Sequence, residues 1–368
     1  MADSPLRAAV VVEQLWQATP GGSGTYVRNL VGALARRDDV KPVGLAARHD
    51  APPVGGPLPV PVVHSRLPRT ALYQSWQRLR APRPEARIRG VQVVHATTWA
   101  TPPTRLPLVV TVHDLAFLDR PEAFTPHGNA WFRRALDDVD ARAAVVIVPS
   151  LTTADRCAEA GLDRDRLRVV PHGVDVPTPS EADVADVRRR YALPRPYVMW
   201  AGTVEPRKNL STLLEAFDQV AEAQPDLDLV LVGPPGWGAV PVVPTARRER
   251  VRFTGFVPDA DLHALYAGAS AFAFPSLAEG FGLPVLEAMA HGVPVVTSSG
   301  TSCAEVLGDA GATVPALDAD ALARGLLDAI GAPGRAWAAR GLARAATFSW
   351  DAAAEATLAA YQDAIRAG

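Results

Sequence analysis

The sequence is poor in cysteine and lysine and has no long hydrophobic run. Its two cysteines, Cys157 and Cys303, lie far apart and match neither a metal-ligand spacing nor a disulfide framework. No apolar stretch approaches the roughly 20 residues that span a bilayer, and the apolar stretch near the N-terminus is too short for a signal peptide. These absences argue against a disulfide-stapled or membrane-spanning chain and predict a reduced, cytoplasmic setting.

Only two lysines, Lys41 and Lys208, stand against 35 arginines, so each lysine is a candidate for a specific role. Residues 1–172 hold 22 basic and 16 acidic side chains, and the excess lies almost wholly in residues 66–89, with seven arginines against Glu85. No array of stacking aromatic residues and no known module accompanies this basic stretch. The pattern therefore does not indicate nucleic-acid binding.

What the chain does contain is a regular alternation of short apolar runs and helical patterns. Its 368 residues exceed one ordinary core, and 48% hydrophobic with 21% charged residues is typical of a globular protein. Strand–helix alternation twice over predicts two doubly wound α/β domains. The expected strands are of the buried, parallel kind and lie at 8–13, 91–96, 108–114, 143–150, 197–203, 227–233, 251–256, 271–276 and 293–298. Residues 167–175 close the first series.

The break between the two series falls near residues 173–195, where prolines interrupt the pattern. We therefore expect an N-terminal domain over 1–174 and a C-terminal domain over 175–348. Residues 349–368 read as a final amphipathic helix capped by Ser349, and Ser150 is expected to cap the helix after it. Ligands of such folds bind at the carboxyl ends of parallel strands, so two such edges can face each other across a cleft.

The stretch AEGFGLPVLEA (278–288) places two glutamates around a turn. Gly280 and Gly282 loosen the chain, and Pro284 suits the first turn of a new helix. Glu279 is therefore expected on a loop and Glu287 one turn into a helix, whose N-terminus suits an anion. Two acceptors of sugar hydroxyls around an anion site describe a pocket for a sugar nucleotide. The alternative is a loop acid and a helix acid in a salt bridge.

The stretch GTVEPRKNL (202–210) follows the first strand of the second domain. Arg207 and Lys208 stand just before a helix that Asn209 is expected to cap. Adjacent cations at a helix N-terminus neutralise a pyrophosphate, with Arg acting as a fork and Lys as a point charge. The Lys208 side chain is expected to be partly exposed in the empty cleft. The alternative is a solvated basic pair.

Glycines and histidines mark the corresponding edge of the first domain. The glycine turn at residues 21–24 follows the first strand and can present backbone amides to a phosphate, although it is not GxGxxG. His113 stands at the end of a strand, where it can hydrogen-bond or transfer a proton. A structural glycine turn and a structural histidine are the alternatives. His172 reads as a structural residue near the domain boundary.

Five D-x-D triplets occur, and such a triplet can hold a divalent ion against a diphosphate. Because the chain has 39 acidic residues, five matches are unremarkable, and we interpret them as solvated surface without a metal. The triplets are Asp138/Asp140, Asp163/Asp165, Asp226/Asp228, Asp259/Asp261 and Asp318/Asp320.

Together these motifs resemble the retaining glycosyltransferases of the GT-B fold, family 4 (glycosyltransferase group 1), nearly end to end. EGFGLPVLE resembles the family's E-x7-E signature, and GTVEPRKN and HGVPVVTS resemble its donor half. GGSGTYVRNL and TVHDL resemble its acceptor half, and PHGVD resembles the interdomain segment. The resemblance implies two Rossmann-like domains, with the donor bound by 175–348 and the acceptor by 1–174, and with the final helix packed back on the N-terminal domain.

The resemblance also implies roles in the second domain. Arg207 and Lys208 would hold the donor diphosphate, Glu287 would accept hydrogen bonds from the ribose, and Glu279 would bind the transferred sugar. The donor site would also include Gly280, Phe281, Gly282 and Leu283. No cofactor or metal is implied, because the cations stabilise the leaving group. The sequence departs from many members at Thr203, which leaves Arg207 to supply the charge. It also departs at Ala304, where many members have proline in the loop near the donor.

In the first domain the resemblance gives His113 a contact with the transferred sugar and Gly22 an approach to the phosphates or the acceptor. The implied reaction moves a hexose from a nucleotide sugar, first GDP-mannose, to an unidentified acceptor. A UDP-hexose donor is the alternative within this class. A bilobed solute-binding protein and a catalytically silent partner subunit are alternatives from other classes.

The basic stretch 65–89 places Leu72, Tyr73, Trp76 and Leu79 at helical spacing. It is a candidate for peripheral contact with an anionic membrane or an anionic acceptor, where each arginine adds about 1 kcal/mol. The alternative is a basic helix that packs its apolar side on its own domain.

Overall fold

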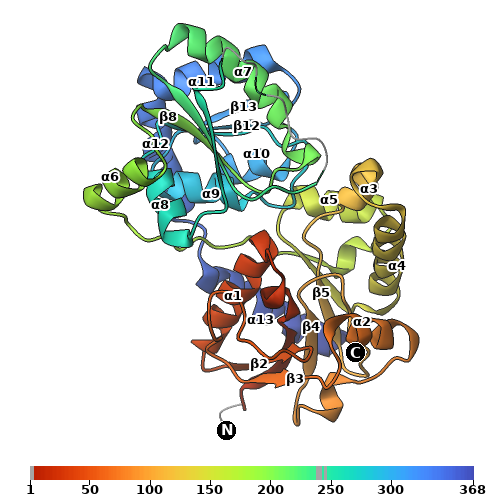
Figure 1. Ribbon diagram of the computed structural model, residues 1–368. Helices are drawn as coiled ribbons and strands as arrows, with labels where there is room; N and C mark the ends of the chain where they lie inside the picture. The colour runs from red at the N-terminus through yellow and green to blue at the C-terminus, as the bar shows by residue number, and fades with distance from the viewer. Residues whose placement is uncertain (1–3, 238–242, 244–246) are drawn as a thin grey trace. The chain divides into compact units, whose positions relative to one another are not determined.

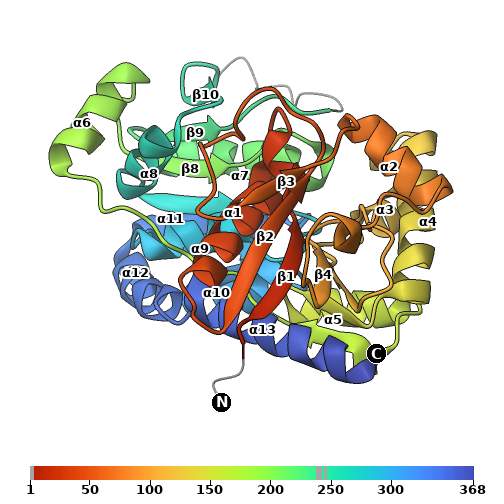
Figure 2. The same cartoon turned by 90° about the horizontal axis from the view of Figure 1, so that it is seen from below.

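The computed structural model describes residues 4–237, 243 and 247–368, and the chain forms two compact units. Unit 1 comprises Met1–Gly173 with Ser349–Gly368, and unit 2 comprises Val174–Phe348. Each unit contains a parallel sheet with helices packed around it (Figures 1 and 2). The predicted fold class, two doubly wound α/β domains, is confirmed. Within the described ranges, no helix is both long and apolar enough to cross a membrane.

The sheet of unit 1 runs in the order β3-β2-β1-β4-β5-β6-β7, with parallel pairing throughout the described strands. The chain builds outward from β1 to β3 and then returns to β4, so the strand order reverses between β1 and β4. The strands are β1 (Leu6–Val11), β2 (Val40–Ala46), β3 (Val62–His64), β4 (Val93–Ala96), β5 (Leu108–Thr111), β6 (Val145–Val148) and β7 (Leu167–Val169).

Two helices of unit 1 begin at the predicted caps. The Ser150 hydroxyl accepts from the Thr153 amide, and the Ser349 hydroxyl accepts from the Ala352 amide. The final helix packs against α1, as Figure 1 shows. The helices are α1 (Gly21–Ala35), α2 (Arg69–Arg78), α3 (Ala116–Asp119), α4 (Pro126–Arg142), α5 (Leu151–Glu159) and α13 (Trp350–Ala367), and the 3₁₀ helices are η1 (Glu13–Trp16), η2 (Pro84–Ala86), η3 (Pro121–Ala123) and η4 (Arg164–Arg166).

The sheet of unit 2 runs in the order β10-β9-β8-β11-β12-β13, again with parallel pairing among the described strands. The order reverses between β8 and β11, and ligands of doubly wound sheets bind at the carboxyl edge of such a point. The strands are β8 (Tyr197–Ala201), β9 (Asp228–Val232), β10 (Val251–Gly255), β11 (Ala271–Phe274), β12 (Val295–Ser298) and β13 (Ala312–Val314).

The central strands of unit 2 are buried along their whole length, because helices cover both faces of the sheet. Trp200 and Phe272 are fully buried in its core. The helices are α6 (Glu181–Arg190), α7 (Leu210–Ala223), α8 (Asp259–Ala267), α9 (Leu283–Ala290), α10 (Ser302–Leu307), α11 (Ala319–Ile330) and α12 (Ala332–Ala345), with the 3₁₀ helix η5 (Pro206–Lys208).

Candidate active site

The turn after β8 carries the two candidate cations. The chain forms η5 and enters α7 through Asn209, whose φ of 56° lies in the left-handed region. Asn209 was expected to cap α7, but its side chain makes no such bond. Instead, its amide donates to the carbonyls of Pro275 at 3.0 Å and Ala316 at 2.5 Å. Asn209 therefore ties the cation turn to the loop after β11, which leads to Glu279.

Arg207, Lys208 and Glu279 come together at the carboxyl edge of β8 and β11. The Lys208 ammonium donates to one Glu279 oxygen at 2.6 Å, and Nη1 of Arg207 lies 2.9 Å from the other. Arg207 also pairs through Nε with Glu205 at 2.6 Å and donates to the Ala278 carbonyl at 3.0 Å. Two carboxylates therefore balance two cations in this charge cluster of Glu205, Arg207, Lys208 and Glu279.

Burial and charge oppose each other at Glu279. Burial by itself raises the pKa of this carboxyl, but the charges of Arg207 and Lys208 outweigh it and lower the pKa to about 2. Lys208 is only 7% exposed, and its ammonium lies 4.8 Å from the centre of the Phe274 ring. The expectation that Lys208 would be partly exposed is therefore wrong, because Glu279 and the aromatic ring enclose its side chain.

The segment between the two glutamates turns as predicted. The helix α9 begins after Gly282, has Pro284 in its first turn and has no side-chain cap, which leaves its N-terminus suited to an anion. Gly282 has a φ of 108°, and a Cβ there would lie 2.8 Å from the Cys303 sulfur, so a side chain does not fit. Phe281 and Leu283 are buried side chains, and Gly280 is buried beside them.

Glu287 lies one turn into α9, as predicted, in different surroundings. The Tyr266 hydroxyl donates to it at 3.1 Å. Burial raises the pKa of Glu287 to about 7; the hydrogen bond from Tyr266 offsets part of this rise, and the negative charge of Asp259 adds to it. The Tyr266 ring stacks on His291, whose Nε2 lies 3.0 Å from Nδ1 of His263. This carboxyl is therefore partly protonated at neutral pH.

The candidates of unit 1 lie around Tyr26. His113, just beyond β5, donates through Nε2 to the Thr97 carbonyl at 2.9 Å, so Nδ1 accepts in the neutral ring. Burial lowers the pKa of His113, and the Tyr26 ring meets it edge to face at 4.9 Å. His172 is buried against Tyr26, consistent with a structural residue. Gly22 is exposed in the first turn of α1, the helix that carries Tyr26.

A buried polar network beside His113 was missed by the sequence analysis. The Thr111 hydroxyl lies 2.8 Å from Nε2 of His95 and 2.9 Å from the Tyr26 hydroxyl. The Tyr361 hydroxyl lies 2.8 Å from Nδ1 of His95. Burial lowers the pKa of His95 to about 3, so this ring is neutral. The four residues come from α1, β4, β5 and α13, so no spacing in the sequence predicts that they lie together.

The D-x-D triplets are explained in part by caps and ion pairs among the described residues. The side chains of Asp163 and Asp318 accept backbone amides at helix starts. Asp228 is 1% exposed and lies 3.3 Å from Arg195 and 3.0 Å from Arg250. The interpretation of these triplets as solvated surface is therefore wrong for Asp228, which is a buried ion-pair partner.

The helix α2 carries part of the basic stretch 65–89. Leu72 and Trp76 are buried in unit 1, so the helix packs its apolar side on its own domain, which was the alternative reading. Leu79, just after the helix, is 74% exposed. Contact of this stretch with an anionic membrane or acceptor stays a prediction.

Solved structures share this fold over nearly the whole chain. A sucrose-phosphate synthase from Thermosynechococcus elongatus matches with a TM-score of 0.76 and 23% identity, covering 99% of this chain and 100% of that one. HepE from Anabaena, in complex with UDP-glucose, matches with a TM-score of 0.70 and 19% identity, covering 95% and 97%. The two doubly wound units therefore form a GT-B glycosyltransferase fold.

Sequence comparisons give the class and the family. The profile of Glycosyltransferase Family 4 matches residues 20–177, and that of Glycosyl transferases group 1 matches residues 195–331. O-antigen chain mannosyltransferase B of Escherichia coli is 35% identical over 267 residues, 69% of this chain and 70% of the relative. D-inositol 3-phosphate glycosyltransferase of Acidothermus cellulolyticus is 31% identical, covering 94% of this chain and 86% of the relative.

The protein is therefore a glycosyltransferase. It belongs to glycosyltransferase family 4, group 1, and the resemblance seen in the motifs is confirmed. This assignment rules out a bilobed solute-binding protein.

Proposed function

We propose that this glycosyltransferase moves a hexose from a nucleotide-sugar donor to an acceptor with retention at the anomeric carbon. The observation that carries the proposal is the charge cluster around Glu279, at the reversal point between β8 and β11. In this proposal unit 2 binds the donor and unit 1 the acceptor. Arg207, Lys208 and the N-terminus of α9 hold the diphosphate.

The proposed chemistry uses the two ends of the donor differently. The bond from the anomeric carbon to the diphosphate breaks, and the acceptor oxygen bonds to that carbon on the same face. The acceptor proton passes to the leaving phosphate, whose growing charge is stabilised by Arg207 and Lys208. Glu279, ionised because its pKa is about 2, lies beside the developing positive charge of the sugar. Nδ1 of His113 accepts a sugar hydroxyl, and Glu287 accepts the ribose hydroxyls.

GDP-mannose is the first donor to test. It is supported by the 35% identity to O-antigen chain mannosyltransferase B. The Gly-Trp stretch GPPGWG (233–238), which also suggested mannose, ends at Gly238, which lies outside the described residues. A UDP-hexose is the second candidate, because HepE, of the same fold, was solved with UDP-glucose.

A panel of UDP-, GDP-, ADP- and TDP-sugars tests the proposal through thermal shift and hydrolysis. We expect one nucleotide class to raise the melting temperature and to be hydrolysed slowly in the absence of acceptor. Proton NMR of the fresh product should show the anomer of the donor. Binding of none of these sugars overturns the donor assignment, and the opposite anomer overturns retention. Hydrolysis should survive EDTA; complete loss restored by Mg²⁺ or Mn²⁺ contradicts leaving-group stabilisation by side chains alone.

A further inference from the structure

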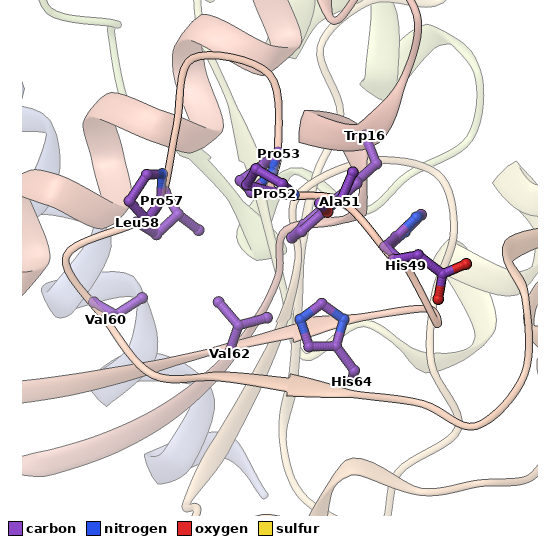
Figure 3. Close-up of a pocket in the computed structure, with 11 residues that line it drawn as sticks. Trp16, His49, Ala51, Pro52, Pro53, Pro57, Leu58, Val60, Val62 and His64 are labelled. Carbon is purple, nitrogen blue, oxygen red and sulfur yellow. The ribbon is translucent and has the colours of Figure 1, made fainter.

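Unit 1 contains a pocket of about 330 Å³ that neither the motifs nor the family comparison assigns (Figure 3). Three of its lining residues follow successive strands of one edge of the sheet. Trp16 lies in η1 after β1, His49 lies after β2, and His64 ends β3. The pocket therefore opens at the carboxyl edge of β1, β2 and β3, the edge at which such sheets bind ligands.

The loop that forms one wall of this pocket, residues 51–61, is anchored to η1 and α1 by hydrogen bonds. Five of its eleven residues are proline, and prolines reduce the freedom that a loop loses on binding. The Trp16 indole donates to the Ala51 carbonyl at 2.8 Å, and the Val54 amide donates to the Leu15 carbonyl at 2.9 Å. Arg28 of α1 donates to the Gly56 carbonyl at 2.9 Å. The pocket is preformed, so a ligand pays little ordering entropy on entering it.

Two imidazoles line the pocket in fixed orientations. His49 donates through Nε2 to the buried carboxylate of Glu13, at 2.9 Å, and stacks on the Trp16 ring at 4.6 Å. His64 donates through Nδ1 to the Ala47 carbonyl at 2.9 Å. Because a carboxylate and a carbonyl oxygen both only accept, each neutral ring keeps its other nitrogen as an acceptor: Nδ1 of His49 and Nε2 of His64. With the Asp50 carboxylate, the pocket offers acceptors for several hydroxyl groups.

The charge of the lining selects among ligands. None of the eleven residues that line the pocket is lysine or arginine, and Asp50 adds a negative charge. This set disfavours a phosphorylated polyol, which needs cationic or amide donors. The walls of Val60, Val62 and the prolines are apolar, but a hydrocarbon chain would bury the two imidazole acceptors without partners. An uncharged sugar ring, with an apolar face and a rim of hydroxyl donors, matches both parts of the lining.

The position of the pocket in the sheet indicates which residue of an oligosaccharide it can hold. The ends of β2 and β5 are three strand positions apart, or roughly 14 Å across the sheet, and His113 follows β5. This separation is longer than one pyranose ring. We infer that the pocket is a distal subsite for a neutral sugar of an oligosaccharide acceptor, at least one residue removed from the sugar that reacts. The inference rests on the proposed function, in which His113 marks the reacting end.

Val60→Trp, which fills the pocket, tests the inference, with Val54→Trp as its control. Val54 lies in the same loop, is 52% exposed and does not line the pocket. Transfer is measured to methyl α-mannoside and to an α-linked mannotetraose, beside donor hydrolysis and the melting temperature. We expect Val60→Trp to lower kcat/KM for the tetrasaccharide at least tenfold relative to that for the monosaccharide. Val54→Trp should leave that ratio unchanged.

Saturation-transfer NMR without donor gives a second reading that does not depend on the donor assignment. The tetrasaccharide should bind the wild-type protein and lose its signal in Val60→Trp and in His64→Ala. Binding of myo-inositol 1-phosphate in place of the tetrasaccharide, or competition by farnesol, overturns the sugar assignment. An equal fall in transfer to both saccharides in Val60→Trp places the pocket at the reacting sugar and overturns the distal assignment. If no nucleotide sugar binds, the proposed function is overturned. The saccharide-binding result can still be interpreted, because it is measured without donor.

Discussion

Glu279 and Glu287 stand eight positions apart and carry the same side chain, yet their pKa values are shifted in opposite directions. The pKa of Glu279 is lowered to about 2, whereas that of Glu287 is raised to about 7. Burial raises the pKa of both carboxyls. The difference comes from their partners: Glu279 lies within 2.9 Å of two cations, whereas Glu287 receives a hydrogen bond from the neutral Tyr266 hydroxyl.

Where burial is similar, the charge of the partner decides whether the pKa of a carboxyl is raised or lowered. Glu279 is an anion at any physiological pH, while Glu287 gains and loses its proton near neutrality. In the proposed donor site this gives a permanent negative charge at the sugar end. The ribose end then depends on pH, because only the ionised Glu287 is a pure acceptor for two ribose hydroxyls.

Removing a cation from Glu279 should have the largest effect. In Lys208→Ala we expect kcat to fall roughly 10²–10³-fold, because a cation beside the leaving diphosphate acts mostly in the transition state. The same change leaves the buried Glu279 with Arg207 as its remaining cationic partner. The free energy of unfolding should therefore fall by about 2–3 kcal/mol. Donor hydrolysis and urea unfolding measure the two effects.

The matched control is Lys41→Ala, since the chain has one other lysine and it is exposed on β2. It should change neither quantity. If Lys208→Ala turned over donor at the wild-type rate, the assignment of the diphosphate to this turn would be wrong.

Removing the anion itself should change how stability depends on pH. Because the folded pKa of Glu279 lies near 2, below the usual 4.5, its contribution is present above pH 4.5 and is lost as pH falls toward 2. A shift of this size corresponds to about 3 kcal/mol at neutral pH. In Glu279→Gln that contribution disappears. The free energy of unfolding of the variant should therefore lie furthest below that of the wild type at pH 7, and the difference should be roughly halved at pH 3.

Urea unfolding at pH 7 and pH 3 measures this gap. Glu249→Gln, an exposed change in the same unit, serves as the control and should track wild type at both pH values. A gap for Glu279→Gln that is the same at pH 3 as at pH 7 contradicts the depressed pKa.

The sequence predicted the strands with continuous apolar runs and failed where the run is broken. β2 (Val40–Ala46) was missed because Pro42 and Gly44 interrupt it, and both residues disfavour a strand reading. β3 and β13 have three residues each, too few for a periodicity to show. The turn into α9 was predicted correctly, because glycine and proline carry local conformational information.

The structure brings together three residues that the sequence singled out, but the electrostatics of this cluster could not be predicted from the sequence. Motif spacing identified Arg207, Lys208 and Glu279, but it cannot show that Phe274 and Glu279 enclose the ammonium, because those contacts bridge about 70 positions. The unassigned pocket was also invisible. It is formed by a proline-rich loop without periodicity and by two histidines that only the sheet brings beside Trp16.

The affinity for the donor should rise with pH as Glu287 ionises. With a pKa of about 7, roughly a tenth of this carboxyl is ionised at pH 6 and most of it at pH 8, so the dissociation constant should be about tenfold weaker at pH 6. GDP-mannose is the ligand of choice because its diphosphate diester does not titrate in this range. Burial lowers the pKa of His291 to about 4 and lowers that of His263, so neither imidazole explains such a change.

Calorimetric titration at pH 6, 7 and 8 measures this dependence. Glu287→Gln should bind weakly at all three, with a flat profile. A wild-type profile as flat as that of the variant contradicts ribose recognition by the ionised carboxylate.

The smallest effect expected is a gain in stability from Glu287→Gln. The folded pKa of Glu287 lies above its unfolded value, so its favourable contribution is complete below pH 4.5 and is lost as pH rises through 7. Above pH 7 the wild type holds a half-buried carboxylate that pairs with no cation among the residues the structure describes. Glutamine avoids this state while still accepting from the Tyr266 hydroxyl. Allowing for solvent screening, we expect the variant to be about 1 kcal/mol more stable than wild type at pH 8 and equal to it at pH 4.5. Tyr266→Phe keeps the ring on His291 and removes the donor, so it should raise the pKa of Glu287 further and move the loss of stability to higher pH. Urea unfolding of the three proteins from pH 4.5 to 8 is the measurement, and a glutamine variant that is less stable than wild type at pH 8 would show that Glu287 is held as a carboxylate after all.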